Sequence, residues 1–256
     1  MGNPSLPPGY QLIRFDDIDS TNLEALRRAR QGEAGPLWIW AERQTQGRGR
    51  QGREWVSDTG NLYATLLVTL NLEPQRASGL SFVAALALAD TLAMLVPNAA
   101  ITLKWPNDVL LNAAKAAGIL IETELHGQRL TAAIGCGLNL AHAPENTRYP
   151  ATSLAAAGVT ITPARGLQHL AYAFATRLAQ WEDGRNFAAI RTAWLAHAHA
   201  LGQTVNLTAG PETITGTVTD LSAEGAMILT LANGTTRALH AGEVQATRQF
   251  TTGTTT

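Results

Sequence analysis

The sequence is poor in cysteine and lacks any segment typical of export or of a membrane span. Cys136 is the single cysteine in 256 residues, so a disulfide framework within the chain is excluded and a reducing compartment fits. Residues 1–10 contain neither a basic segment nor an apolar core, so they do not resemble a secretory signal. The most apolar stretch, residues 80–96, is interrupted by polar side chains and is short for a bilayer. These absences predict a cytoplasmic protein without a membrane partner.

An excess of charge of either sign is also missing. Lys and Arg total 19 against 20 acidic residues, which gives a formal net charge of −1. Proteins that bind nucleic acid usually carry a clear basic excess. The composition therefore argues against a nucleic-acid partner.

Familiar catalytic motifs are absent as well. The sequence contains neither the G-x-S-x-G nucleophile motif nor the Walker phosphate loop. Cys136 stands between two glycines in an apolar strand, which favours an inert core thiol over a reactive one. The histidines show no ligand spacing, so no structural metal is expected.

What the sequence does contain is a glycine- and arginine-rich run within residues 41–55. Three glycines alternate with three arginines and a tryptophan closes the run: Gly47, Arg48, Gly49, Arg50, Gly52, Arg53 and Trp55. Glycines allow a backbone to approach a ligand closely, and arginines grip phosphate or carboxylate at two points. Such a loop has little to bury, so we expect it to be mobile until an anionic ligand orders it. We interpret it as a lid over a phosphate-bearing small molecule. An arginine-rich nucleic-acid box and an ordinary solvated loop remain alternatives.

Hydrophobic periodicity predicts an α+β fold. Strands are expected at 10–15, 38–42, 61–70, 101–105, 109–111, 118–123 and 130–140, and helices at 21–30, 77–96, 162–181 and 186–202. After residue 202 short strands alternate with glycine turns, among them the hairpin signal Asn233-Gly234, which indicates a small SH3-like β-barrel. We therefore divide the chain into domains at 1–202 and 203–250, with a disordered tail at 251–256.

Two polar segments stand where predicted elements begin or end. Ser20, Thr21 and Asn22 open the first predicted helix, either as simple caps or as the wall of a polar pocket. The strand that ends at residue 105 meets a proline, so the charged side chains of residues 104–108 can point into a cleft. Gly135 and Gly137 suggest close backbone approach, to a neighbouring strand or to a ligand.

Four segments together resemble the biotin–protein ligases (biotin–acetyl-CoA-carboxylase ligases). They are Ser20-Thr-Asn22, the loop 44–55, Lys104-Trp-Pro-Asn-Asp108 with Lys115, and Gly135-Cys-Gly-Leu-Asn139. The runs Gly-Arg-Gly-Arg-x-Gly-Arg and Lys-Trp-Pro-Asn-Asp are highly specific to that family, and the resemblance covers residues 10–248. It implies a mixed β-sheet with helices packed on it, as in class II aminoacyl-tRNA synthetases and biotin–lipoate ligases, followed by the SH3-like β-barrel. It also implies that ATP activates biotin to biotinyl-5′-AMP, which then modifies a lysine of a biotin carboxyl carrier domain and releases AMP.

The resemblance implies a role for each matching residue. Biotin would be bound by Ser20, Thr21, Asn22, Gln44, Gly47, Arg48, Gly49, Arg50, Lys115 and Gly118. ATP or the adenylate would be bound by Arg48, Arg50, Arg53, Trp55, Asn107, Lys115 and Asn139. Trp55 could instead anchor the end of the lid in the core, and Asn139 could instead form a structural turn.

The reaction brings a carboxylate to a triphosphate, which requires fixed positive charge. Lys115, Arg50 and Lys104 are the catalytic candidates that supply it. Asp108 is the fourth candidate, and it would either hold Mg²⁺ or orient the incoming lysine amine. Mg²⁺ would arrive as the complex with ATP.

The resemblance is to the monofunctional type, because too few residues precede the catalytic region for a helix-turn-helix domain, and operator binding is not expected. A homodimer through an exposed sheet edge and a nucleotide contact from Arg248 are further suggestions of the resemblance. Three alternatives remain: a lipoate or octanoate ligase or transferase, a nucleic-acid-binding module formed by the loop and the small barrel, and an inactive biotin-binding scaffold.

Overall fold

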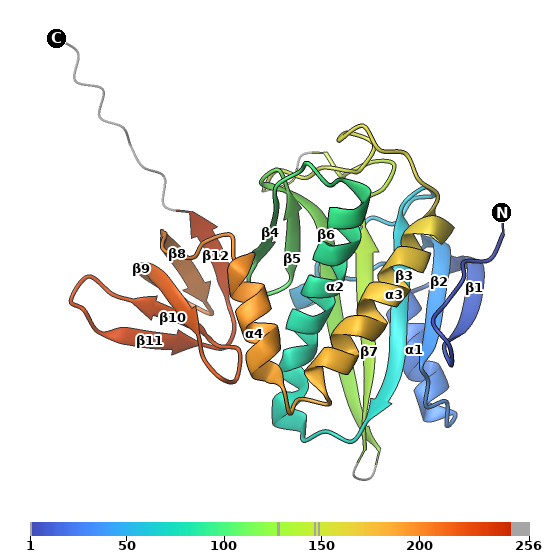
Figure 1. Ribbon diagram of the computed structural model, residues 1–256, viewed down its shortest axis with the longest axis horizontal. Coiled ribbons are helices and arrows are strands. Elements are labelled where there is room, and N and C mark those ends of the chain that lie inside the picture. Colours follow the sequence, from blue (N-terminus) through green and yellow to red (C-terminus); the bar gives the residue numbers. More distant parts are fainter. Residues whose placement is uncertain (1, 127–128, 146, 148, 247–256) are drawn as a thin grey trace.

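The computed structural model describes residues 2–126, 129–145, 147 and 149–246, and it contains two β-sheets (Figure 1). The expected tail at 251–256 and Arg248 lie outside the described residues. The first sheet has seven strands in the order β1-β2-β3-β7-β6-β5-β4. Its strands are β1 (Gln11–Ile18), β2 (Leu37–Gln44), β3 (Leu62–Leu70), β4 (Ile101–Lys104), β5 (Asp108–Leu111), β6 (Ala114–His126) and β7 (Arg129–Leu138). Only β1 and β2 pair in parallel among these described strands, so the predicted mixed sheet is confirmed.

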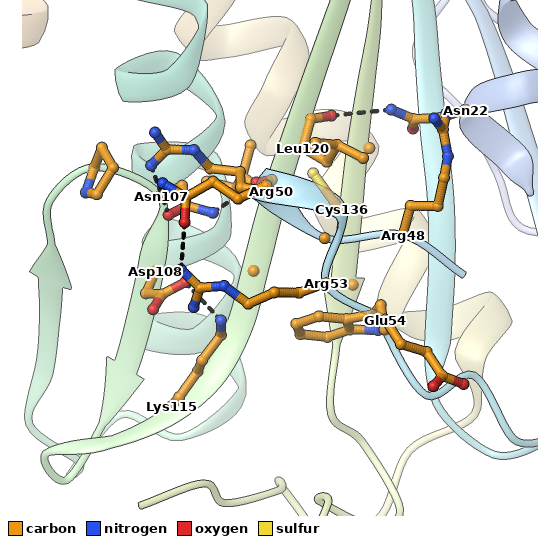
Figure 2. A pocket seen from close by; sticks show the side chains of 18 of the residues that line it. Asn22, Arg48, Arg50, Arg53, Glu54, Asn107, Asp108, Lys115, Leu120 and Cys136 are labelled. Atoms are coloured by element: carbon orange, nitrogen blue, oxygen red, sulfur yellow. Dashed lines mark hydrogen bonds and ion pairs between the residues drawn. The ribbon is translucent and has the colours of Figure 1, made fainter. Parts of the chain in front are cut away.

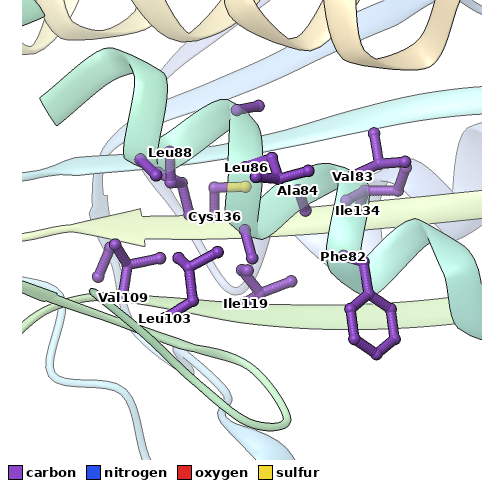
Figure 3. Packing of buried hydrophobic residues seen from close by; sticks show 14 of the residues in the cluster. Phe82, Val83, Ala84, Leu86, Leu88, Leu103, Val109, Ile119, Ile134 and Cys136 are labelled. Atoms are coloured by element: carbon purple, nitrogen blue, oxygen red, sulfur yellow. The ribbon is translucent and has the colours of Figure 1, made fainter. Parts of the chain in front are cut away.

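Among the described residues, helices α2 (Gly79–Leu95), α3 (Pro163–Trp181) and α4 (Phe187–Ala196) lie on one face of this sheet, and α1 (Thr21–Arg30) lies on the other (Figure 1). Short 3₁₀ turns lie at Arg50–Gly52 and Pro74–Ser78. Figure 3 shows the main core, in which Ile119, Ile134 and Cys136 of the sheet pack beneath α2. A separate apolar cluster joins α1 to the opposite face, with Ala25 and Leu26 against Ile39 and Leu67.

The spacing of the apolar residues between 77 and 96 predicts one apolar stripe on a helix, but helix α2 is buried around most of its circumference. It packs between the sheet, α3 and α4, so residues outside the stripe, such as Leu86 and Ala89, are buried as well. Pro74–Leu95, which includes α2, is the one described stretch that could cross a membrane by length and composition. In the structure 67% of its most apolar window is buried inside the fold, which is the environment of a core helix.

The predicted end of the last helix was wrong because tertiary contacts override the local pattern. The helix was expected to continue to residue 202, but α4 ends at Ala196 and Leu201 is 42% exposed. The chain after α4 instead pairs with the edge of β4, where the Leu103 amide donates to the His197 carbonyl and the His199 amide to the Leu103 carbonyl. His197 and His199 therefore do not lie on a helix.

The C-terminal strands form a five-stranded sheet in the order β11-β10-β9-β8-β12. They are β8 (Thr204–Ala209), β9 (Glu212–Leu221), β10 (Met227–Thr230), β11 (Thr236–Leu239) and β12 (Glu243–Ala246). The Asn233-Gly234 hairpin between β10 and β11 is confirmed. This sheet packs beside α4 and α2: Arg191 donates to the Leu221 carbonyl at 2.7 Å, and Gly225 contacts Phe82. The domain boundary at residue 202 stays a prediction.

Candidate active site

The cavity lies at the N-terminal end of α1, on the face of the first sheet that α1 covers. Strands β6 and β7 carry glycines there. Gly118 of β6 pairs with Gly137 of β7, and Leu120 pairs with Gly135. Because the glycines have no side chain, this part of the sheet forms a shallow floor. The cavity above it measures about 150 Å³.

The Trp55 indole lies directly on this floor. A Cβ atom at Gly137 would lie 2.5 Å from Trp55 Cε2, and one at Gly118 would lie 2.7 Å from Trp55 Cζ3. A Cβ at Gly135 would lie 2.2 Å from Asn22 Oδ1. The expected close approach at these glycines is therefore to side chains that line the cavity.

A polar wall rises from the start of α1. Thr21 donates its amide and its hydroxyl to Gln44 Oε1, at 2.8 and 3.0 Å, and Gln44 Nε2 donates to Ser57 at 3.0 Å. Beneath them the buried Thr65 hydroxyl lies 2.8 Å from Thr21 Oγ1 and 2.7 Å from Asn22 Oδ1. Ser20, at the N-cap position, makes no side-chain cap hydrogen bond. The spacing of Thr21 and Glu24 predicts a capping box, but this prediction is wrong because the Thr21 hydroxyl donates to Gln44 in the cavity wall.

The lid residues 44–55 fold across the cavity and are held by groups of the chain itself. The Gly49 amide donates to the Arg53 carbonyl at 2.7 Å, and the Trp55 amide donates to the Gly47 carbonyl at 2.9 Å. Each lid arginine contacts another element: Arg48 with Glu122 at 2.7 Å, Arg50 with Asn107 at 3.3 Å and Arg53 with Glu243 at 3.4 Å. The chain's own acidic and amide side chains thus supply contacts for the lid, and its mobility in the absence of an anionic ligand stays a prediction.

Positive side chains converge at the end of the cavity near β4 and β5 (Figure 2). Lys115 Nζ lies 2.7 Å from Asp108 Oδ1 and 5.2 Å from the centre of the Trp55 ring. Lys104 Nζ lies 3.9 Å above the Tyr149 ring, a cation–π geometry. These positions place the expected turn at residues 104–108 at the cavity edge.

Burial and neighbouring charges shift the pKa of Arg50. Burial lowers the pKa of its guanidinium; Asp108 opposes this shift and Arg53 adds to it. An arginine remains charged at neutral pH despite such a shift. The cavity thus keeps a partly desolvated positive charge beside Lys115.

The structure brings most of the expected site residues into one cavity lining. These are Ser20, Thr21, Asn22, Gln44, Arg48, Gly49, Arg50, Arg53, Trp55, Lys104, Asn107, Asp108, Lys115 and Gly118. Gly47 and Asn139 are not among the lining residues. Gly47 packs against Trp55 and Ser57, and Asn139 donates to the Thr152 carbonyl at 3.0 Å, as a structural turn residue would.

Several residues of this site are not marked by any sequence motif, and four of them carry polar side chains that bear on its chemistry. Tyr63 and Glu243 line the cavity, while Thr65 and Glu122 support its polar wall. Tyr63 and Thr65 lie on a strand that was correctly predicted, but only the sheet register shows which side chains face the glycine floor. Glu122 is separated from its partners by too many residues for any local pattern to signal the contact.

Neither a reactive thiol nor a preformed metal cluster is found in the described part of the chain. Cys136 is buried beneath α2, and burial raises the pKa of its thiol to about 12. Within the described ranges, no three His, Cys, Asp or Glu side chains gather as metal ligands.

A cavity with an uncharged hydrogen-bonding wall at one end and converging cations at the other suits an enzyme that joins an organic acid to a nucleotide. Comparison with known proteins agrees. Residues 12–139 match the Biotin/lipoate A/B protein ligase family, and residues 200–246 match the Biotin protein ligase C terminal domain. The chain belongs to the biotin/lipoate A/B protein ligase family.

Individual relatives cover nearly the whole chain. A biotin–[acetyl-CoA-carboxylase] ligase from Paracoccus denitrificans is 43% identical over 82% of this chain and 90% of that protein. A biotin protein ligase from Aquifex aeolicus in complex with biotin and ATP superposes with a TM-score of 0.75 and 28% identity, covering 92% of this chain and 97% of that one. A Leishmania major biotin protein ligase in complex with biotinyl-5-AMP gives a TM-score of 0.61 and 28% identity, covering 92% of this chain and 100% of that one.

Proposed function

We propose that this chain activates biotin with ATP to biotinyl-5′-AMP and then transfers biotin to a lysine of a biotin carboxyl carrier domain. In the first step a biotin carboxylate oxygen forms a bond to the α-phosphorus, and the bond to the β-phosphate breaks as pyrophosphate leaves with its electron pair. In the second step the lysine amine attacks the acyl carbon, loses a proton, and AMP leaves. The observation that carries the proposal is the cavity in which Lys115, Arg50 and Lys104 face a neutral hydrogen-bonding wall.

The wall suits the ureido ring of biotin. That ring is neutral and carries both N–H donors and a carbonyl acceptor, so matched polar groups recognise it better than charge does. Ser20, Thr21, Asn22 and Gln44 offer such groups on the cavity wall.

The cationic end suits the reacting groups. Carboxylate and phosphate repel each other strongly in a partly desolvated site, so catalysis here requires positioning and fixed positive charge. Lys115 would bridge the biotin carboxylate and the α-phosphate, and Arg50 and Lys104 would neutralise the phosphates. Asn107, which accepts a hydrogen bond from Arg50, would help to place the nucleotide.

The lid would shield the reactive anhydride from water. Arg53 joins the lid to Glu243 of β12, so the C-terminal sheet would help to hold the lid closed. Trp55 would limit the space above the floor and place the adenylate. Backbone groups of Gly47 and Gly49 would contact biotin, while Asn139 would act on the fold of the site alone.

Mg²⁺ would enter with ATP. Magnesium commonly binds through one or two carboxylates together with substrate phosphates, and Asp108 lines the cationic end of the cavity. When bound, the ion would neutralise phosphate charge, and Asp108 would hold it. Once pyrophosphate has left, the same carboxylate could orient the lysine amine of the carrier.

A cytoplasmic location and a carrier domain of a biotin-dependent carboxylase as partner are parts of the same proposal. The homodimer suggested by the resemblance stays a prediction that a sedimentation measurement decides.

The test is adenylate formation. The protein is mixed with biotin, α-labelled ATP and Mg²⁺, and a carrier domain is added second, with Lys115→Ala as the control. We expect labelled biotinyl-AMP that disappears as the carrier gains biotin, and none with the variant. Product with lipoate or octanoate but not with biotin would move the assignment to the related ligases. No adenylate with any acid would leave a binding scaffold and contradict the proposal.

A further inference from the structure

We propose that Glu122 is a positioning residue that sets the biotin preference of this site by fixing, together with the Leu120 carbonyl, the direction of the Asn22 amide. The inference rests on the proposed function, because it concerns how the polar wall presents itself to biotin. Glu122 does not belong to any of the sequence motifs described above.

Glu122 lies on β6, on the same side of the strand as Gly118 and Leu120. One carboxylate oxygen, Oε2, accepts from Asn22 Nδ2 at 3.0 Å and from Arg48 Nη2 at 2.7 Å. The Glu122 side chain is 27% exposed, so water competes only partly for this oxygen. A single carboxylate thus ties the start of α1 and the lid to the same strand.

The hydrogen bonds leave only one direction for the Asn22 amide. Its Nδ2 donates one hydrogen to Glu122 and the other to the Leu120 carbonyl at 3.1 Å (Figure 2). Both partners can only accept, so the reversed amide would place oxygen against oxygen twice. Asn22 Oδ1 therefore lies on the opposite side, above Gly135 of the floor.

The Asn22 oxygen keeps accepting capacity toward the cavity. It lies 2.7 Å from the Thr65 hydroxyl, which has one proton to donate. A carbonyl oxygen accepts two hydrogen bonds, so at least one lone pair is left for a ligand. Asn22 lines the cavity and is 3% exposed, which makes this acceptor almost fully desolvated.

A desolvated acceptor selects ligands that donate. The ureido N–H of biotin can satisfy it, whereas the dithiolane ring of lipoate has no donor and would leave it unpaired. A buried polar group left without a partner is costly, and sites built around such groups discriminate strongly against analogues that lack the matching atom. Glu122 would thereby favour biotin over lipoate without touching either ligand.

The experiment measures binding of biotin and ATP to Glu122→Ala and Glu122→Gln, with Glu124→Gln as the matched control. Glu124 lies two residues further along β6 and pairs with Arg30 on α1. Loss of a hydrogen bond to a charged group corresponds to about 10- to 100-fold in affinity. We expect Glu122→Ala to raise the Kd and KM for biotin by about that factor. The KM for ATP should not rise, because ATP does not use this acceptor and loss of Glu122 frees Arg48 instead of removing a contact of ATP.

Glu122→Gln and Glu124→Gln separate the effect of the Glu122 charge from that of a neighbouring carboxylate. Glu122→Gln keeps an acceptor for Asn22 but removes the charge that Arg48 faces, so we expect about a 3- to 10-fold weaker biotin affinity. Both Glu122 variants should narrow the preference for biotin over lipoate by the same factor as the loss in biotin affinity. Glu124→Gln should leave all these quantities at the wild-type values.

Two results would overturn the inference. One is wild-type biotin affinity in Glu122→Ala, or in Glu122→Gln if the alanine variant does not fold. The other is an equal loss of biotin and ATP affinity, which a general structural role would produce. Calorimetric titration with biotin alone needs no turnover, so it tests Glu122 even if wild-type protein forms no adenylate and the proposed function fails.

Discussion

A methyl group placed under Trp55 tests the arrangement of lid and floor. In Gly137→Ala the new Cβ would lie 2.5 Å from Trp55 Cε2. Carbon atoms pack best at about 3.5–4.0 Å, so the indole must rise by about 1 Å. The backbone at Gly137 is not in the left-handed region, so alanine adds steric conflict without backbone strain.

The magnitudes follow from where Trp55 lies. Overpacking a closed core costs about 1–3 kcal/mol, and a residue at the end of a loop can yield toward the lower limit. A displacement of about 1 Å in a positioning group costs about 100-fold in rate. We therefore expect Gly137→Ala to lose about 100-fold in adenylate formation while its free energy of unfolding falls by about 1 kcal/mol.

The assay is isotopic exchange between pyrophosphate and ATP, together with thermal unfolding. Gly166→Ala in α3 is the control, because its Cβ would meet Leu140 at an ordinary 3.4 Å and is remote from the cavity lining. In a Trp55→Ala background the added methyl at Gly137 should cost nothing further, since the clash is gone. A wild-type exchange rate in Gly137→Ala, or a penalty that persists without the indole, would refute the reasoning.

Three further predictions concern single side chains. Lys115→Ala should reduce adenylate formation by about 100- to 1,000-fold. The variant removes fixed positive charge and leaves Asp108 without its partner at 2.7 Å. A loss below about tenfold in the exchange assay would contradict this role. Burial raises the pKa of the Cys136 thiol to about 12, so iodoacetamide at pH 8 should label it only after unfolding. Because the folded pKa is raised, stability from this group is complete below about pH 9 and falls as the pH approaches 12, which unfolding in urea at pH 8 and pH 10.5 can measure. Thr162→Ala should cost about 1 kcal/mol by denaturant titration, since its side chain caps α3 at the Arg165 amide, whereas an unchanged midpoint would show that the cap contributes nothing.

The sequence predicts the elements of this fold better than their ends. Alternation and helical spacing locate the strands and helices, and the Asn233-Gly234 signal locates a hairpin, because these depend on neighbouring residues. The end of α4 at Ala196 was not predictable in this way. There the chain forms backbone hydrogen bonds with Leu103 of β4, nearly a hundred residues earlier.

The same limit applies to the site. Motif residues such as Lys115 and Arg50 stand out because they cluster in short runs of unusual composition. Glu122 does not, since it resembles any charged residue on a half-exposed strand. Its contacts bridge 100 residues to Asn22 and 74 to Arg48, so only the folded chain shows them.

The internal partners of the lid arginines have a consequence for ligand selection. An anion that enters the cavity competes with Glu122, Asn107 or Glu243 for the N–H donors of an arginine. A solitary phosphate ion exchanges one contact for another, so its net gain in free energy is small. A ligand that also makes ring contacts in the cavity and hydrogen bonds with the wall gains binding free energy from several contacts at once. The lid therefore imposes a threshold: abundant small anions are too weak to displace the internal partners, whereas a ligand joining a ring system to a nucleotide can do so.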